Sequence, residues 1–243
     1  MGRHKAILAL QNGQVPERYQ RNIGTIGIDG QLRLLKAKVA VIGAGGLGGT
    51  VIELLARQGV GQIRIVDGDT FAEHNLNRQL LATEHNLGLN KAVAAAARVA
   101  VINSDVTVQA VKQMLDAENA VEVLSDMDVI VDALDSISVR LLLSKTAQQL
   151  GIPLVHGAIA GFTGQVTSIL AGDAGLEKIY KLTTGSSRGI ETILGNPAAT
   201  PALTAAVQVQ EVVKILTGIG EILHKRLFYF DTELNIYEIL QLE

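Results

Sequence analysis

Four closely spaced glycines between two apolar runs are the part of this chain best suited to holding a phosphate. The chain reads KVAVIGAGGLGG over residues 38–49, and a second apolar run at 63–66 follows a helix-like segment. A strand, a glycine turn and a helix in this order form the βαβ unit that binds nucleotides. The helix N-terminus offers unpaired N–H groups and positive potential. We therefore expect a nucleotide phosphate at this turn.

The glycines of this turn have separate predicted roles. Gly43 allows the tight turn, Gly45 lets the backbone approach a phosphate, and Gly48 lets the helix pack on the sheet. Gly46 is assigned to the same nucleotide site. Asp67 follows Gly48 by 19 residues, at a strand end where an acidic side chain accepts hydrogen bonds from ribose hydroxyls. A glycine-rich turn beside a surface aspartate is the weaker alternative, because spacing, periodicity and acidic residue all agree.

The elements that must position this turn predict an α/β fold. Strands are expected at 39–42, 63–66, 106–111, 128–133, 152–156, 162–170, 227–230 and 236–240. Helices are expected as two short pieces after Pro16 and at 91–103, 117–124, 139–150 and 200–217. The run at 162–170 follows the preceding strand too closely for a parallel crossover. We predict a Rossmann-like doubly wound sheet, parallel in the N-terminal half with antiparallel strands in the C-terminal half.

One domain is expected over residues 16–243, after a flexible arm at 1–15 that lacks a long periodic pattern. Its nucleotide-binding half would span 36–150 and its partner-binding half 151–243. The glycine- and serine-rich tract at 171–199 is expected to be a mobile loop within the second half.

Composition narrows the classes of partner and of site. The net charge of −3 and the pI near 6.0 give no basic field for nucleic acid or a membrane surface. No apolar run approaches the 18 or so residues of a membrane span, so a cytoplasmic protein is expected. The chain has 0 cysteines, which excludes disulfides, thiolate metal sites and a cysteine nucleophile.

Ordered motifs cover almost the whole chain after residue 15. They are RYQRNI at 18–23, VIGAGGLGG at 41–49, IVDGDTFAEHNLNRQ at 65–79, GLNK at 88–91, DALDSISVR at 132–140, HGAIAGFTGQVTSI at 156–169 and GNPAATPALTAAVQVQEVVKILTG at 195–218. With these motifs the chain resembles the ubiquitin-activating-like adenylyltransferases of the HesA/MoeB/ThiF family. The resemblance implies that ATP adenylates the C-terminal carboxylate of a small ubiquitin-like sulfur-carrier protein, with release of pyrophosphate.

The implied reaction builds negative charge on phosphate oxygens, so cations and a metal are required. The resemblance assigns Arg78 and Lys91 as catalytic cations and Arg21 as a third, which would reach the neighbouring subunit of a homodimer. It assigns Asp135, after a buried strand, to Mg²⁺ together with substrate phosphates. An alternative role for Asp135 is the N-cap of the next helix. Many relatives carry Asn where this chain has Ser136.

Other polar residues receive weaker assignments. Asp69, Asn75 and Asn77 are assigned to ribose or phosphate in second rank, because Asp and Asn also form turns. Gln165 is expected where the partner's tail runs, unless it is simply a solvent-facing strand residue. His156 is expected as a core histidine at a strand end, since adenylation by a carboxylate removes no proton.

The chain departs from many members of the family by lacking cysteine, and three other functions are compared with adenylation below. Many relatives bind a structural Zn²⁺ with two CxxC pairs, but the chain reads GLEKIYKLTTG at the first position, so no zinc and no intermediate through sulfur are expected. One alternative function activates a tRNA-bound carboxylate, as a threonylcarbamoyladenosine dehydratase does. Another is a non-catalytic nucleotide-binding scaffold. A nicotinamide dehydrogenase is disfavoured, because no hydride-handling group or second substrate domain is visible.

Overall fold

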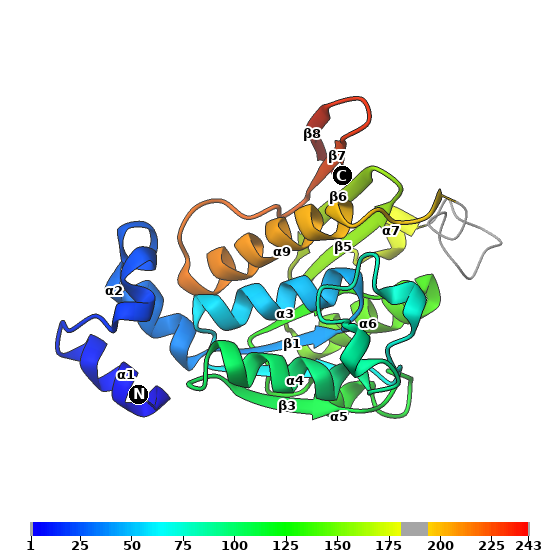
Figure 1. Ribbon diagram of the computed structural model, residues 1–243. Coiled ribbons are helices and arrows are strands. Elements are labelled where there is room, and N and C mark those ends of the chain that lie inside the picture. The colour runs from blue at the N-terminus through cyan, green and yellow to red at the C-terminus, as the bar shows by residue number, and fades with distance from the viewer. Residues whose placement is uncertain (1, 181–193, 243) are drawn as a thin grey trace.

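A single sheet runs through the whole molecule (Figure 1), and the computed structural model describes residues 2–180 and 194–242. Its strands are β1 (Lys38–Ile42), β2 (Gln62–Val66), β3 (Thr107–Val111), β4 (Val129–Asp132), β5 (Leu154–Ala160), β6 (Thr163–Ile169), β7 (Arg226–Asp231) and β8 (Ile236–Gln241). They lie in the order β3-β2-β1-β4-β5-β6-β7-β8. This order places β1 in the interior of the sheet, with β2 and β4 as its neighbours.

The type of strand pairing changes once along the sheet. β1 to β5 pair in parallel, whereas β5, β6, β7 and β8 pair antiparallel. Only Gly161 and Phe162 separate β5 from β6, too few residues for a parallel crossover. The predicted fold class, parallel in the first half and antiparallel in the second, is confirmed.

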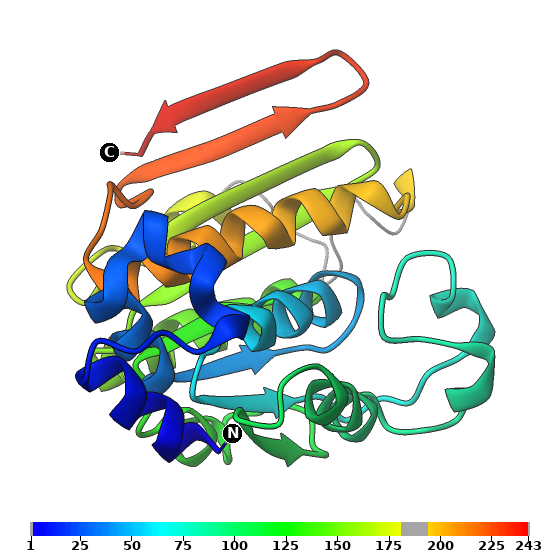
Figure 2. The ribbon, with the colours of Figure 1, turned by 60° about the vertical axis from the view of Figure 1, so that its left-hand side comes forward.

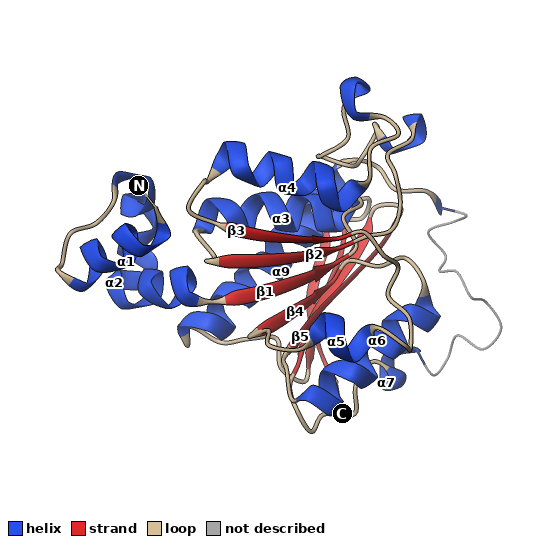
Figure 3. Ribbon diagram, turned by 90° about the horizontal axis from the view of Figure 1, so that it is seen from below, coloured by secondary structure: helices blue, strands red, loops and turns tan. Residues whose placement is uncertain are grey.

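Helices cover both faces of the sheet (Figure 3). One face carries α3 (Gly46–Gln58), α4 (Lys91–Ile102) and α9 (Ala199–Thr217), and the other carries α5 (Ala120–Leu124), α6 (Ile137–Leu150) and α7 (Glu177–Tyr180). Successive residues of β1 supply the two apolar layers: Val39 and Val41 join the first, Ala40 and Ile42 the second. A strand buried on both faces reads as a continuous apolar run, which is why it stands out in the sequence.

The segment before β1 is more ordered than expected. Residues 1–15 were expected to form a flexible arm, but α1 (Arg3–Gln11) is a helix that buries Ala6 and Leu10 completely against Tyr19 and Leu35. Only these two apolar positions of α1 are buried, and two are too few to produce a recognisable periodicity. The arm prediction is therefore wrong for residues 3–11.

The helical segment after Pro16 has two pieces, as predicted. It consists of a 3₁₀ turn at Glu17–Tyr19 and α2 (Gln20–Lys36), which is kinked at Gly27. Gly27 has φ 67°, a left-handed conformation that glycine adopts without strain. β1 begins two residues after α2 and runs away from it, so α2 lies near the amino ends of the strands (Figure 3).

The predicted mobile loop at 171–199 is only partly described, because residues 181–193 lie outside the described residues. Its first part is packed: Leu176 is completely buried in the apolar layer of α6, and α7 follows it.

The β7–β8 hairpin forms one outer edge of the sheet (Figure 2), and all six residues of β8 are exposed. Within the described residues, no helix is both long and apolar enough to span a membrane.

Candidate nucleotide site

The glycine turn lies between the carboxyl end of β1 and the start of α3, and two of its glycines are sterically required. A Cβ atom on Gly48 would lie 1.8 Å from the Gly43 carbonyl oxygen, and one on Gly43 would lie 2.5 Å from the Ala133 carbonyl oxygen. Gly43 also has φ 96°. The turn therefore packs directly on the backbone that follows β4, and side chains at these two positions would separate them.

The other two glycines border side chains from later segments of the chain. A Cβ atom on Gly45 would meet the Gln79 amide nitrogen at 3.5 Å, and one on Gly46 would meet Pro201 at 3.4 Å. Gln79 is buried, and its Oε1 accepts no hydrogen bond from the described part of the chain. Gln79 was not among the predicted site residues, although it follows Arg78 directly in the NLNRQ string.

Asp67 ties the end of β2 to the glycine turn. Its Oδ2 accepts a hydrogen bond of 2.7 Å from the Ala44 amide, and its Oδ1 accepts one of 2.8 Å from the Asp69 amide. Burial raises the pKa of the Asp67 carboxyl above its usual value, although the two amide donors act against that rise. Each carboxylate oxygen has a second acceptor site. The buried carboxylate would thus gain from further donors such as ribose hydroxyls.

Lys91 and Asp69 form an ion pair at the same edge of the sheet. Lys91 Nζ lies 3.2 Å from Asp69 Oδ2, with the lysine side chain 9% exposed and the aspartate side chain 60% exposed. Asn90 holds this arrangement, because its Nδ2 donates to the carbonyls of Asp67 and Asp69 while its Oδ1 caps α4. The buried ammonium is therefore paired with a carboxylate that water already solvates.

The segment between Asp69 and Lys91 brings Arg78 near the turn but leaves its guanidinium locally bound. Arg78 Nη1 donates to the His74 carbonyl at 2.9 Å and to Asn77 Oδ1 at 2.8 Å. Asn75 is buried, and its Oδ1 accepts a hydrogen bond from the Ala72 amide. Asn75 thus shapes the loop, whereas Asn77 is exposed.

Asp135 lies in the turn between β4 and α6, beside the glycine turn. Its side chain is exposed and makes no hydrogen bond to the described part of the chain. Ser136, not Asp135, is the N-cap residue of α6, so the capping role gains no support. The described residues contain no group of three or more His, Cys, Asp or Glu side chains placed to hold a metal ion by themselves. A Mg²⁺ ion held by one carboxylate and substrate phosphates needs no such cluster, and the free Asp135 carboxylate fits that arrangement.

Arg21 does not join these residues within one subunit. It is exposed near the start of α2, two residues after Tyr19. The Tyr19 hydroxyl accepts a hydrogen bond from Asn103, which directly follows the last residue of α4. Since α4 begins at Lys91 beside the site and runs along the sheet, its C-terminal end lies near the amino ends of the strands, at the far end from the site.

Sequence reasoning missed a buried polar network behind Asp135. Asp132, the last residue of β4, is completely buried, with Oδ2 2.7 Å from His156 Nδ1 and 3.6 Å from Arg140 Nε. The Tyr180 hydroxyl lies 2.8 Å from Arg140 Nη1 and 3.3 Å from His156 Nε2. His156 is a buried strand residue, as expected, and burial lowers the pKa of its imidazole. The DALDSISVR and HGA strings contain three of these residues, but nothing in them indicates the contacts.

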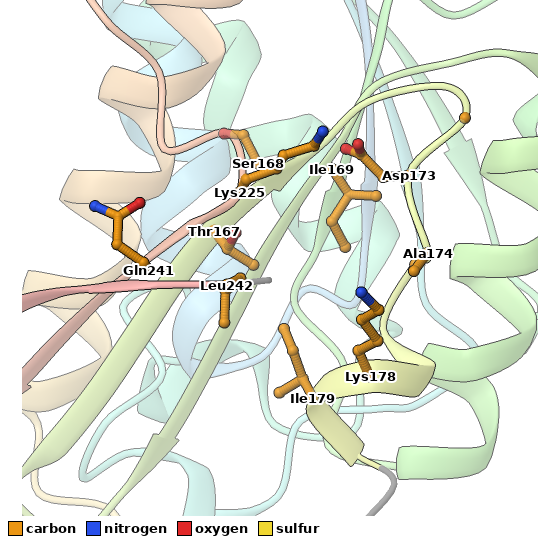
Figure 4. Close-up of a pocket in the computed structure, with 12 residues that line it drawn as sticks. Thr167, Ser168, Ile169, Asp173, Ala174, Lys178, Ile179, Lys225, Gln241 and Leu242 are labelled. Atoms are coloured by element: carbon orange, nitrogen blue, oxygen red, sulfur yellow. The ribbon is translucent and has the colours of Figure 1, made fainter.

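A cavity of about 680 Å³ lies apart from this site (Figure 4). It is bounded by the end of β6, by α7 with Lys178 and Ile179, and by Lys225 and the end of β8. None of the predicted site residues lines it. The candidate nucleotide site is instead the edge of the sheet where the glycine turn, Asp67, Lys91 and Asp135 meet.

Comparison with known proteins gives consistent relatives. The SAMP-activating enzyme E1 of Haloferax volcanii is 38% identical over 224 residues, covering 88% of this chain and 81% of that protein. The sulfur carrier protein adenylyltransferase of Thermus thermophilus is 35% identical over 232 residues, covering 88% and 83%. The chain spans about half (49%) of a longer relative, the adenylyltransferase and sulfurtransferase MOCS3 of Arabidopsis thaliana, at 35% identity over 91% of the chain.

A solved structure agrees in fold. E. coli MccB with ATP superposes with a TM-score of 0.81 at 20% identity, covering 93% of this chain and 72% of that one. The sequence model of the ThiF family matches residues 19–243, almost the entire chain. With the glycine turn, the strand order and these relatives in agreement, the chain belongs to the ThiF family.

Proposed function

We propose that this chain is an ATP-dependent adenylyltransferase that activates the C-terminal carboxylate of a small ubiquitin-like sulfur-carrier protein. A carboxylate oxygen attacks the α-phosphorus of ATP, a new oxygen–phosphorus bond forms, and the bond to the leaving pyrophosphate breaks. The carboxylate is already deprotonated, so the protein needs no general base. Its tasks are to position the two reactants and to stabilise phosphate charge.

One observation carries the proposal: the glycine turn, the Asp67 carboxylate and the Asp135 turn meet at the carboxyl ends of three adjacent strands. β1 lies between β2 and β4: the chain passes from β1 to β2 and β3 on one side, then crosses back to β4 on the other side. Such a switch point is where open α/β sheets bind ligands. The Ala44–Asp67 hydrogen bond and the contact of Gly43 with Ala133 keep the three segments together.

Each predicted residue receives a role that this arrangement supports. Asp67 would bind the ribose, and the turn at Gly43, Gly45, Gly46 and Gly48 would hold phosphates at the N-terminus of α3. Lys91 and Arg78 would neutralise phosphate charge. Arg78 now donates to a carbonyl and an amide oxygen, and a phosphate oxygen is the stronger acceptor for a guanidinium. Asp69 pairs with Lys91, Asn75 shapes the loop, and Asn77 accepts a hydrogen bond from Arg78.

Magnesium belongs to the same proposal. Asp135 would hold it together with the phosphates, since its carboxylate is exposed beside the turn and bound to nothing else in the described part of the chain. Bound with ATP, Mg²⁺ would supply positive charge to the phosphate oxygens. Asp135 contributes a negative oxygen ligand at a fixed place on the sheet edge.

The partner would dock on the C-terminal half of the sheet. Gln165 on β6 pairs with Ala158 on β5 and Tyr229 on β7, so these side chains share one face. β8 adds exposed apolar side chains at its edge, including Ile236 and Leu240. The names of the two relatives of similar length, a SAMP-activating enzyme and a sulfur carrier protein adenylyltransferase, support a protein substrate. A cytoplasmic location is part of the proposal, because the reaction consumes ATP.

A homodimer completes the proposal. Arg21 lies at the amino ends of the strands, away from its own glycine turn, so it can act only in the site of a neighbouring subunit. Its exposure leaves it available for that contact. This arrangement would add a third cation to Lys91 and Arg78.

The test combines pyrophosphate exchange with mass spectrometry of candidate carriers incubated with ATP, Mg²⁺ and this protein. Exchange that depends on a carrier, and is lost when its C-terminal residue is removed, is the expected result. AMP release with tRNA alone would indicate a tRNA-bound carboxylate as substrate. ATP binding without exchange or AMP release would indicate a scaffold, and either outcome would overturn the proposal.

A further inference from the structure

Three buried side chains and the half-buried Tyr180 form a closed ring of contacts behind the Asp135 turn. Asp132 contacts both His156 and Arg140, and Tyr180 contacts both of those residues in turn. With the Nδ1 hydrogen of a neutral His156 donated to Asp132, Nε2 is free to accept from the Tyr180 hydroxyl. That hydroxyl accepts from the Arg140 guanidinium. Every contact of the ring then joins a donor to an acceptor.

This ring holds one backbone unit from two sides. The Leu134 amide donates to Asp132 Oδ1 at 3.0 Å, and the Leu134 carbonyl accepts a hydrogen bond from Arg140 Nη2. Arg140 Nη2 also lies 3.4 Å from the Gly157 carbonyl of β5. Both polar groups of the residue that precedes Asp135 are thus fixed by buried side chains.

The same turn is fixed on its other side by the phosphate-binding backbone. The Ala133 amide donates to the Ile42 carbonyl at 3.0 Å, and the Ala133 carbonyl packs where a side chain on Gly43 would be. The backbone before Asp135 is therefore held from both sides, while its own carboxylate is left exposed. A reactive group with a fixed backbone and a free charge needs little reorganisation during the reaction.

Tyr180 brings this support from a distant part of the chain. It is the last residue of α7, and its hydroxyl contacts Arg140 of α6, which lies 40 positions earlier in the chain. Arg140 is buried and uses a planar fork of donors, so its direction depends on all the acceptors around it. Removing the Tyr180 hydroxyl takes away one of those acceptors without changing the ring that packs beside His156.

We infer that Tyr180 and Arg140 are positioning residues, which hold the Leu134 backbone so that Asp135 is presented to the phosphates of the bound nucleotide. The role of Asp135 in this inference rests on the proposed adenylation. The positioning itself is a property of the folded chain without substrate. The two parts can therefore be tested separately.

The main test is amide hydrogen exchange at Leu134 in Tyr180→Phe. Loss of one hydrogen bond to a charged group should speed exchange at Leu134 by about tenfold, because the Arg140 fork is no longer held in place. Tyr19→Phe is the matched control: it also removes a tyrosine hydroxyl, one that contacts Asn103 at the opposite end of the strands. It should leave exchange at Leu134 unchanged.

Kinetics extend the test to Asp135. In Tyr180→Phe, kcat for carrier-dependent pyrophosphate exchange should fall by about tenfold while KM for ATP changes by less than about threefold. Arg140→Lys keeps the charge but loses the fork, and should slow the reaction further. Wild-type exchange at Leu134 in Tyr180→Phe would overturn the positioning role, as would an unchanged kcat. Absence of pyrophosphate exchange in the wild-type protein would instead reject the proposed function.

Discussion

At the scale of single residues, Asp135 is an exposed acidic group of the site that accepts no hydrogen bond from the described part of the chain. Asp135→Asn preserves the shape of the side chain but removes its charge. Because this charge would act on the reacting phosphates in the proposed reaction, the rate of pyrophosphate exchange should fall on the order of a hundredfold or more. ATP affinity, measured by calorimetry, should change little, since the glycine turn, Asp67 and Arg78 remain.

Asp126→Asn provides the control for that substitution. Asp126 is an exposed aspartate three residues before the start of β4, at the end of the strand opposite to Asp135. Its substitution should leave exchange at the wild-type rate. Exchange within a few fold of wild type in Asp135→Asn would rule out the metal-binding role.

His156 makes a separate prediction about pH, because burial lowers the pKa of its imidazole in the folded state. Above the unfolded value near 6.5 the imidazole is neutral in both states and adds no pH dependence. Below it, the unfolded chain binds a proton that the folded chain disfavours. The free energy of unfolding should therefore fall with decreasing pH, by at most about 1.4 kcal/mol per unit from this residue.

Urea unfolding between pH 7.5 and 5.5 tests this prediction in His156→Gln, whose amide can still donate to Asp132. The variant should lose part of the pH dependence of wild type. His85→Gln, which changes an exposed histidine, should keep all of it. Equal pH dependence in wild type and His156→Gln would contradict the buried neutral imidazole.

Residues at strand ends could be located from sequence, whereas their buried contacts could not. Asp67 and Asp135 each follow an apolar run, and the carboxyl ends of parallel strands share one edge of the sheet. Asp132 and His156 lie 24 positions apart, and Arg140 and Tyr180 lie 40 apart. No periodicity relates such positions, so the ring behind Asp135 appears only once the strands are paired.

At the scale of elements, the turn from β1 into α3 depends on close contact between backbones. Gly48→Ala would place a methyl group 1.8 Å from the Gly43 carbonyl oxygen, so α3 must move away from the sheet. We expect loss of ATP binding and a clear drop in the urea midpoint. Gly46→Ala, at the start of the same helix, meets Pro201 at an ordinary 3.4 Å and should keep or slightly raise the midpoint. A wild-type midpoint and wild-type ATP affinity in Gly48→Ala would contradict this account.

Element boundaries were predictable where a single segment determines them. The two helix ends predicted from glycines are confirmed: α6 is closed by Gly151 and α9 by Gly218, both in the left-handed conformation. β5 extends to Ala160, beyond the predicted end at His156, because the small residues that follow form a strand by pairing with β6. α1 is stabilised by distant contacts with Tyr19 and Leu35. Neither pairing between strands nor packing against distant residues can be predicted from the local sequence.

At the scale of the whole molecule, the glycine turn and Arg21 lie at opposite ends of the strands of one sheet. α2 leads into the amino end of β1, and the glycine turn follows its carboxyl end (Figure 3). The motif that contains Arg21 is thus separated from the site by the length of the strands. The sequence places both in one domain, but only the fold shows that a single subunit cannot bring them together.

Mixing two inactive variants tests whether Arg21 acts across a dimer. Arg21→Ala protomers retain an intact Asp135, and Asp135→Ala protomers retain an intact Arg21. In a hybrid dimer one of the two sites contains both groups. Random exchange makes half of the dimers hybrid, so the mixture should regain about a quarter of wild-type pyrophosphate exchange per site.

A second mixture controls for nonspecific rescue. Lys91→Met and Asp135→Ala remove groups that lie at the same sheet edge of one subunit, so every hybrid site still lacks one of them. That mixture should stay inactive although its subunits exchange equally well, which differently tagged protomers can verify. Activity in the first mixture and none in the second would place Arg21 in the neighbouring subunit's site. If subunits exchange and both mixtures stay inactive, Arg21 does not act in trans, and the third cation of the site must come from elsewhere.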